Sequence, residues 1–97
     1  MHTVYILHSQ KLNRFYTGYT TNLDVRMEFH TNSETRKYTY NADDWTIFFT
    51  VNCESKSQAL AIEKHIKAMK SKAYIENLKK YSEIMEKLFE KYKSSEY

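Results

Sequence analysis

The sequence of 97 residues contains no proline, one glycine and one cysteine. The single cysteine, Cys53, excludes an internal disulfide and supplies no zinc-binding cluster, which favours a reducing compartment. No apolar run approaches the roughly 18 residues that a membrane-spanning helix needs, and no signal-peptide pattern is present. We therefore expect a cytoplasmic protein without disulfides and without a membrane segment.

The only glycine, Gly18, lies in a segment whose other residues favour a strand. Its neighbours in FYTGYT, residues 15–20, are aromatic or β-branched, and such residues are enriched in strands. A glycine inside a strand usually costs about 0.5–1 kcal/mol relative to alanine. Two explanations are open: a β-bulge at this position, or a close approach of backbone or phosphate that a Cβ would prevent.

The length is that of one domain, and the basic residues are unevenly distributed within it. A chain of this size buries roughly 60–65% of its unfolded surface, so the core is modest. Residues 1–53 carry five basic and five acidic side chains, whereas residues 64–80 carry six lysines and one glutamate. Such a basic stripe suits a polyanion such as nucleic acid. A solvated lysine-rich helix face would have the same composition.

The first half of the chain predicts a β-hairpin followed by a helix. Residues 3–7 and 15–20 have strand composition, and the short polar segment between them suits an antiparallel connection. Thr21 or Asn22 can cap the next helix, whose apolar positions are Leu23, Val25 and Met27.

The second half predicts one strand and two helices. Residues 31–44 read as a polar loop, and WTIFFTV at 45–51 is the clearest strand. Ser55 or Ser57 can cap the helix that follows, in which apolar residues recur at helical spacing. These residues are Ala59, Ile62, Ile66 and Met69. A last helix is predicted from 72 to 92, with Ser71 as its cap and with Ile75, Leu78, Met85 and Phe89 on its apolar face.

The predicted order is thus β-β-α-β-α-α. This order predicts an α/β (α+β) fold in which helices flank a small three-stranded antiparallel sheet. The pattern does not decide which strand the third one pairs with. We assign residues 1–80 to the body of the domain and residues 81–97 to a helical extension of it.

Five side chains combine types that could act on a phosphate ester. Two phenols lie on adjacent predicted strands, an arginine and a histidine lie four residues apart on one helix face, and a carboxylate lies on the polar edge of a later helix. These residues are Tyr5, Tyr16, Arg26, His30 and Glu63. Each of them alone is more often structural than functional.

Their order and spacing resemble the GIY-YIG nuclease superfamily. The resemblance is to small single-domain members similar to the N-terminal nuclease module of the bacterial excision-repair incision enzyme. TVY at 3–5 takes the place of the first triplet and YTG at 16–18 that of the second. Residues 18–30 resemble the turn and helix that carry the arginine and histidine, KYTY at 37–40 resembles the loop before the third strand, and 59–72 resembles the helix with the glutamate.

Two positions depart from the pattern of the family. The glycine of the first triplet is replaced by Thr3, where the family tolerates variation. Some members carry an asparagine twelve residues after the metal-binding glutamate, and Ile75 occupies that position here. No role is therefore transferred to an asparagine.

The resemblance implies a metal-dependent DNA endonuclease that uses one divalent ion, Mg²⁺ or Mn²⁺, and no small-molecule cofactor. It makes Glu63 the metal ligand, Tyr5 the preferred base for the attacking water and Tyr16 its partner or alternate. Because an ordinary tyrosine has a pKa near 10, such a base needs cations nearby. Arg26 is expected to hold the scissile phosphate, and His30 to donate to it or to orient the base.

The same resemblance implies a set of DNA contacts and DNA repair as the setting. The expected contacts are Gly18, Lys37, Lys67, Lys70 and Lys72. One alternative is a catalytically weak nucleic-acid-binding module of this fold that acts with a partner protein. Another is a small interaction protein that forms a homodimer through its C-terminal helix. The apolar positions for that dimer are Tyr81, Ile84, Leu88 and Tyr92.

Overall fold

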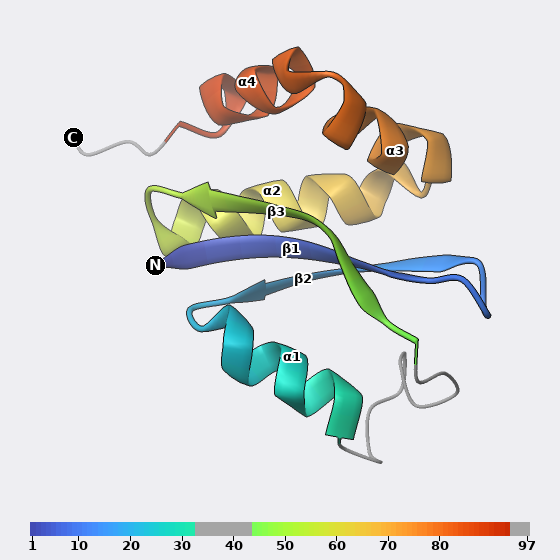
Figure 1. Cartoon of the computed structure of the whole chain (residues 1–97). Helices are drawn as coiled ribbons and strands as arrows, with labels where there is room; N and C mark the ends of the chain where they lie inside the picture. The colour runs from blue at the N-terminus through green and yellow to red at the C-terminus, as the bar shows by residue number, and fades with distance from the viewer. Residues whose placement is uncertain (33–43, 94–97) are drawn as a thin grey trace.

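A computed structural model describes residues 1–32 and 44–93 of the chain (Figure 1). Side chains are described for residues 1–27 and 44–93. The elements in chain order are β1 (His2–Ser9), β2 (Arg14–Thr20), α1 (Leu23–Asn32), β3 (Thr46–Cys53), α2 (Lys56–Met69), α3 (Lys72–Lys80) and α4 (Ser82–Lys91). Among the described residues, no helix is long and apolar enough to span a membrane.

The three strands form one antiparallel sheet in the order β2-β1-β3, which answers the pairing question that the sequence leaves open. β1 is the central strand, and its Tyr5 lies between Gly18 of β2 and Thr50 of β3. The ladder between β1 and β2 runs through Gly18 without a register shift, so of the two open explanations for this glycine the β-bulge is excluded. The irregularity lies instead between β1 and β3, where Ile6 pairs with Phe49 and Leu7 with Ile47.

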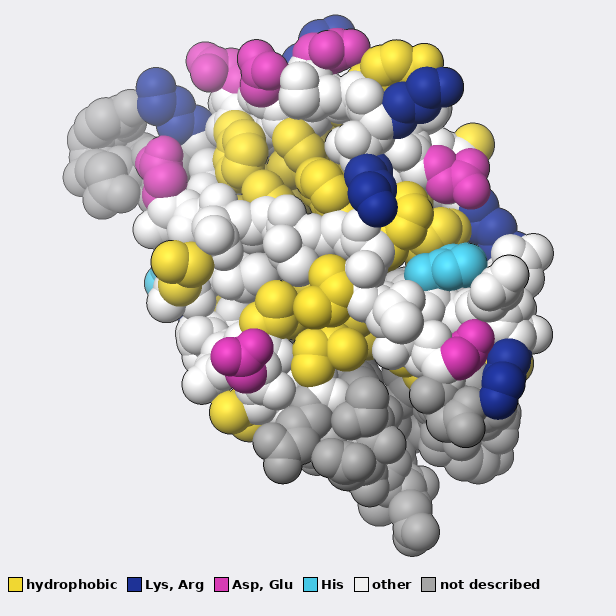
Figure 2. All heavy atoms as spheres, viewed as in Figure 1, with side chains coloured by type: hydrophobic (Ala, Val, Ile, Leu, Met, Phe, Trp, Pro, Cys, Tyr) yellow, Lys and Arg dark blue, Asp and Glu magenta, His cyan; other side chains and the backbone are white. Residues whose placement is uncertain are grey.

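Helices cover both faces of the sheet, with α1 on one face and α2, α3 and α4 on the other (Figure 1). Because side chains alternate along a strand, β1 sends Val4 and Ile6 into the core under α2–α4, and Tyr5 and Leu7 into a smaller core under α1. In Figure 2, apolar side chains reach the surface in two areas, one above the sheet and one below it.

The two cores differ in size. The buried residues of the larger core are Val4, Ile6, Cys53, Ala59, Ile62, Ile66, Ile75, Leu78, Met85 and Leu88. The buried residues of the smaller core are Tyr5, Leu7 and Trp45.

Three of the predicted helix caps are confirmed. The side chains of Ser55 and Ser71 accept hydrogen bonds from the third N–H of α2 and of α3. Asn22 Oδ1 accepts from the Val25 N–H at 3.2 Å at the start of α1. These bonds satisfy N–H groups that a helix start leaves without a partner in the helix.

The last predicted helix is corrected, because residues 72–92 form two helices rather than one. Tyr81 is extended, with φ −121° and ψ 105°, and separates α3 from α4. A single straight helix of that length would span roughly 30 Å, whereas α2 beneath it spans about 21 Å. The break lets Ile75 and Leu78 of α3, and Met85 and Leu88 of α4, enter one core.

Some smaller predictions about exposure and element ends are also corrected. Met69, at the end of α2, is 44% exposed rather than part of the core stripe, and Val25 of α1 is 61% exposed. β3 begins one residue after Trp45, which is buried instead under α1. α1 includes two residues of the predicted 31–44 loop, and residues 33–43 of that loop lie outside the described part.

Most of the surface predicted for a dimer is used within the chain. Leu88 is buried in the larger core, and Ile84 and Tyr92 pack against that core. Tyr81, in the break between the last two helices, is 43% exposed. The C-terminal residues described by the structure therefore contribute to the fold of their own chain.

Asp44, the residue before Trp45, is hydrogen-bonded to the end of β1 and to the hairpin turn that follows it. The buried Ser9 hydroxyl donates to Asp44 Oδ1 at 2.7 Å, and the Lys11 N–H donates to Oδ2 at 2.9 Å. These two hydrogen bonds, the first being the stronger influence, hold the pKa of the Asp44 carboxyl below its ordinary value. The start of β3 is thereby held against the far end of β1.

Candidate active site

The ring of Tyr5 lies across Gly18, and this contact explains why the strand carries a glycine. A Cβ added to Gly18 would stand 2.5 Å from both Cζ and the hydroxyl oxygen of Tyr5, far inside van der Waals contact. Gly18 has no positive φ, so space and not backbone conformation requires it. Since β2 is an edge strand, the gap lets the Tyr5 hydroxyl reach the edge of the sheet.

Tyr16 is the partner of this hydroxyl. The two rings are tilted by 45° with centroids 6.3 Å apart, and the side chains are hydrogen-bonded. Burial is the main cause that raises the pKa of Tyr5 well above its ordinary value, and the hydrogen bond with Tyr16 adds to it. Both influences favour the protonated form of Tyr5.

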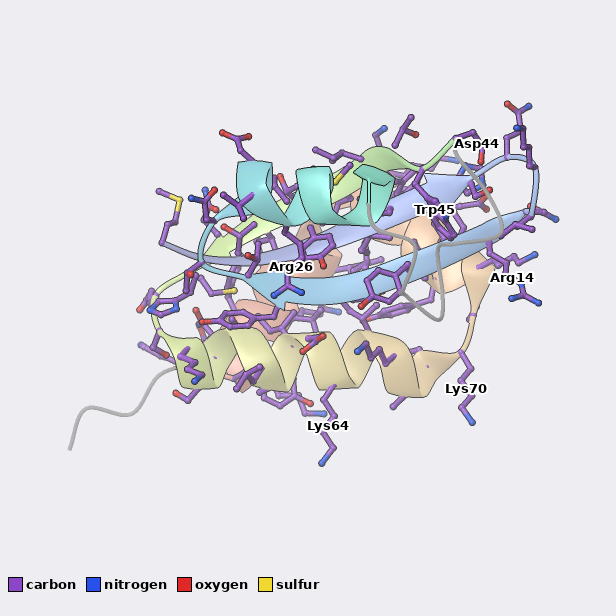
Figure 3. The ribbon with its side chains drawn as sticks, turned by 90° about the horizontal axis from the view of Figure 1, so that it is seen from below. Arg14, Arg26, Asp44, Trp45, Lys64 and Lys70 are labelled. Atoms are coloured by element: carbon purple, nitrogen blue, oxygen red, sulfur yellow. The ribbon has the colours of Figure 1, made fainter. Side chains whose placement is uncertain are left out.

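Arg26 and Glu63 act on the same hydroxyl from two different helices. The positive charge of Arg26 lowers the pKa of Tyr5, and the negative charge of Glu63 raises it. Figure 3 shows Arg26 pointing from α1 across the sheet. Residues from β1, β2, α1 and α2 thus meet around Tyr5.

The Glu63 carboxylate is held close to a lysine of the same helix. Lys67 Nζ lies 3.0 Å from Glu63 Oε2, and the two residues are four apart on α2. The glutamate side chain is only 17% exposed and the lysine side chain is 53% exposed. The carboxylate therefore faces the interior of the site, and the ammonium group lies on its outer side.

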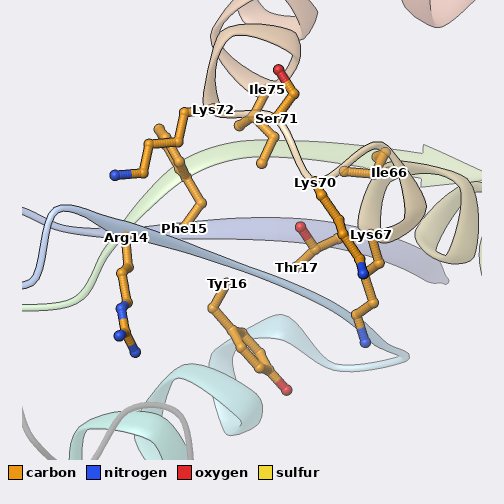
Figure 4. A pocket seen from close by; sticks show the side chains of 10 residues that line it. All are labelled: Arg14, Phe15, Tyr16, Thr17, Ile66, Lys67, Lys70, Ser71, Lys72 and Ile75. Carbon is orange, nitrogen blue, oxygen red and sulfur yellow. The ribbon is translucent and has the colours of Figure 1, made fainter.

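A cleft of about 600 Å³ opens beside these groups, between β2 and the turn that joins α2 to α3 (Figure 4). Its lining is basic and apolar: Arg14, Phe15, Tyr16, Thr17, Ile66, Lys67, Lys70, Ser71, Lys72 and Ile75. The cleft thus contains three of the predicted DNA contacts, Lys67, Lys70 and Lys72. It adjoins the reacting groups because Tyr16 and Lys67 belong to both.

Arg14 is a cleft residue that the sequence did not lead us to predict. It is exposed and lines the cleft as the first residue of β2. One signal could have found it, because Arg14 lies two residues before Tyr16 and alternate strand residues share a face. Another unpredicted feature is the left-handed backbone of Lys70 at the end of α2, with φ 48° and ψ 42°. Glycine usually occupies that position.

Comparison with known proteins decides the family. A family model described as the GIY-YIG catalytic domain matches residues 1–81. The chain belongs to this family. The match confirms the resemblance based on the two triplets, and a nuclease-type function follows from it at the level of the family.

The similar proteins are small, and all of them are named UPF0213 proteins. A UPF0213 protein of Halobacterium salinarum is 36% identical over 69 residues, covering 71% of this chain and 88% of the relative. A UPF0213 protein of Staphylococcus haemolyticus is 38% identical over 66 residues, covering 68% and 79%. The solution NMR structure of a UPF0213 protein from Bacillus halodurans superposes with a TM-score of 0.51 at 34% identity, over 79% of this chain and 80% of that one. This superposition confirms the predicted fold class. The names of the three similar proteins state no activity.

GIY-YIG nucleases generally use a divalent metal, and the residues of this site fit one that needs few protein ligands. The described residues contain no group of three or more His, Cys, Asp and Glu side chains that could enclose an ion. Mg²⁺ is commonly bound through one or two carboxylates and keeps several waters. Glu63 supplies one such carboxylate, and Tyr5, whose pKa its charge raises, carries oxygen rather than sulfur, which suits a hard cation.

Two predicted site residues lie outside what the structure describes. The backbone of His30 is in α1, four residues after Arg26, but its side chain is not among those described. Lys37 lies in the segment 33–43. Gly18, predicted as a DNA contact, makes room for Tyr5 on the side where its Cβ would be, and its contact with DNA stays a prediction.

Proposed function

We propose that the protein is a metal-dependent DNA endonuclease that hydrolyses phosphodiester bonds. The observation that carries the proposal is the meeting of two phenols, a guanidinium and a carboxylate at the end of a basic cleft. Family membership makes hydrolysis of nucleic acid the chemistry to expect. The basic lining accounts for attraction of the DNA backbone, since phosphate contacts supply most non-specific affinity.

In this proposal the groups of the chain act as follows. Arg26 holds the scissile phosphate and stabilises the charge that develops on it, as preorganised donors do in other hydrolases. A divalent ion bound at Glu63 would polarise the phosphate and support the leaving oxygen. Lys67, which is paired with Glu63 and lines the cleft, would be available to a phosphate there if the carboxylate held an ion.

The base is assigned to Tyr16 rather than to Tyr5. Tyr5 is almost fully buried and its pKa is raised, so its proton is harder to remove than that of an ordinary tyrosine. Tyr16 is only partly buried and lines the cleft where the substrate would lie. Tyr5 acts as a positioning residue, because its hydroxyl donates to the Tyr16 oxygen and orients that ring. His30 as a phosphate donor, and DNA repair as the setting, stay predictions.

The test uses the purified full chain and end-labelled DNA in duplex, flap, branched and single-stranded forms, with Mg²⁺ or Mn²⁺. We expect cleavage that depends on the ion. Glu63→Gln should abolish it, while Glu76→Gln, the same change on an exposed residue of α3, should leave it unchanged. Circular dichroism of both variants checks that the fold persists.

A second comparison separates the two tyrosines. Tyr16→Phe removes the base and should lower the cleavage rate more than Tyr5→Phe, which removes only a hydrogen bond to it. Equal effects would contradict the assignment of Tyr16. If no DNA is cut but salt-sensitive binding persists, the alternative of a binding module that acts with a partner is favoured instead.

A further inference from the structure

The cleft is apolar on its floor as well as positively charged on its rim. Its floor includes Phe15, Ile66 and Ile75, which are also part of the larger core or pack against it. Its rim carries four cations, with Arg14 and Lys72 toward one end and Lys67 and Lys70 toward the other in Figure 4. Phosphate contacts alone would need the rim but not the floor.

The ring of Phe15 is supported by other aromatic rings. The His8 ring lies 4.7 Å from it between centroids, and Phe48 meets it edge-on at 4.9 Å. Lys79 Nζ in turn lies 4.7 Å from the centre of the Phe48 ring. A ring held in this way is a fixed flat surface that loses little conformational freedom when a ligand contacts it.

We propose that this cleft binds an unpaired nucleotide next to the cut, with its base against Phe15 and its flanking phosphates on the rim. Within a duplex, both faces of a base are covered by stacked neighbours. The floor can therefore contact a base face only after that nucleotide leaves the stack or when it was never paired. A cationic groove with aromatic contacts is the arrangement that single-stranded nucleic acids bind.

The inference rests on the proposed nuclease and narrows its substrate to DNA with unpaired nucleotides. Arg14 and Lys72 become binding residues on the side of the cleft away from Glu63. Lys70, whose left-handed backbone ends α2, carries one of the cations of the rim. It lies at the turn that forms one wall of the cleft.

Binding is measured on the wild-type chain in EDTA, so that no step depends on metal or cleavage. The probes are a fluorescein-labelled 12-nucleotide single strand, the same sequence as a blunt duplex, and a strand of equal length without bases. We expect the normal strand to bind at least about fivefold more tightly than the baseless strand. It should also bind more tightly than the duplex. A 2-aminopurine base placed along the single strand should be quenched at one position.

Matched variants locate the site. Phe15→Leu should remove most of the preference for the normal strand over the baseless one. The logarithm of the binding constant for the single strand falls with the logarithm of salt concentration. Arg14→Gln and Lys72→Gln should each make this slope less steep by about 0.7. Lys64→Gln removes the same charge from α2 on the side that points away from the sheet (Figure 3), and it should change neither quantity.

Equal binding of the normal and baseless strands, tighter binding of the duplex, or absence of quenching at any position would overturn the inference. None of these results depends on cleavage. A protein that cuts duplex DNA without base preference would keep the proposed function and lose the inference. A protein that binds unpaired bases but cuts nothing would keep the inference about base binding and lose the proposed nuclease function.

Discussion

The two faces of the sheet perform different tasks, although both are built from the same central strand. The face under α2, α3 and α4 contains ten buried residues, almost all aliphatic, and the proposed metal ligand Glu63 lies outside this buried set, on α2. The face under α1 contains three buried residues, among them Tyr5, whose hydroxyl takes part in the site. Stability is thus concentrated on one face. The other face can hold a buried polar group and an exposed arginine.

If the α2–α4 face supplies most of the stability, Ile62→Ala should have the largest effect. Ile62 is fully buried there, and removing such a side chain costs about 2–5 kcal/mol. Urea unfolding followed by circular dichroism measures the loss. Val25→Ala on the exposed side of α1 should change the free energy of unfolding by less than about 0.5 kcal/mol. Similar losses for both variants would show that stability is spread over the two faces.

If the α1 face serves chemistry, Arg26→Gln should affect rate and not stability. We expect the cleavage rate to fall about 10²–10³-fold, as when a preorganised donor is removed elsewhere. The free energy of unfolding should stay within about 0.5 kcal/mol, because the side chain is exposed. Arg26→Lys keeps the charge without the paired donors and should restore only part of the rate. A parallel fall in rate and stability would assign Arg26 a structural role.

Gly18→Ala tests the contact through which the edge strand admits the Tyr5 ring. The added Cβ must displace the ring, which should cost about 1–3 kcal/mol in stability. It should also lower activity. In a Tyr5→Leu background the same substitution should cost less, because the clash is gone. A double-mutant cycle in urea measures this coupling, and a coupling of zero would mean that Tyr5 moves freely.

The smallest effect is expected at the hairpin turn, from the pH dependence of stability. Because the pKa of Asp44 is depressed in the folded state, its contribution is present above the pKa of the unfolded chain, near 3.9, and is lost as pH falls through the folded value. Thermal melts between pH 2 and 6 should therefore fall less steeply for Asp44→Asn than for the wild type. Glu90→Gln, at an exposed position of α4, controls for the change in charge. Identical slopes for the wild type and Asp44→Asn would show that the hydrogen bonds to Ser9 and Lys11 do not persist in solution.

Local patterns were sufficient for most of the fold. The alternation along residues 3–7, the serine caps of α2 and α3, and the helical spacing of Ile62 and Ile66 all depend on neighbours within a few residues. Met69 and the break at Tyr81 were mispredicted. Whether a helix end is covered, and how long a helix can be, depend on the element packed against it.

The candidate site also has a part that the sequence predicted and a part that it did not. The types and order of Tyr5, Tyr16, Arg26 and Glu63 were readable, because they follow one another along the chain at the spacing on which the family resemblance was based. Arg14 and the apolar floor of the cleft could not be read, because they become neighbours of Lys72 and Ile75 only when β2 lies beside the α2–α3 turn. The choice between the two tyrosines also depends on burial, which no spacing reveals.

The amino-acid order by itself determined the element types, the caps and the identity of the reactive groups, since these follow from short-range sterics and hydrogen bonding. Tertiary structure alone decided that β1 lies in the middle of the sheet, that Gly18 leaves the space for the Tyr5 ring, and that burial raises the pKa of Tyr5. The physical reason is that burial and close contact are properties of residues distant in the chain. They exist only after β2, α1 and α2 have packed around the central strand.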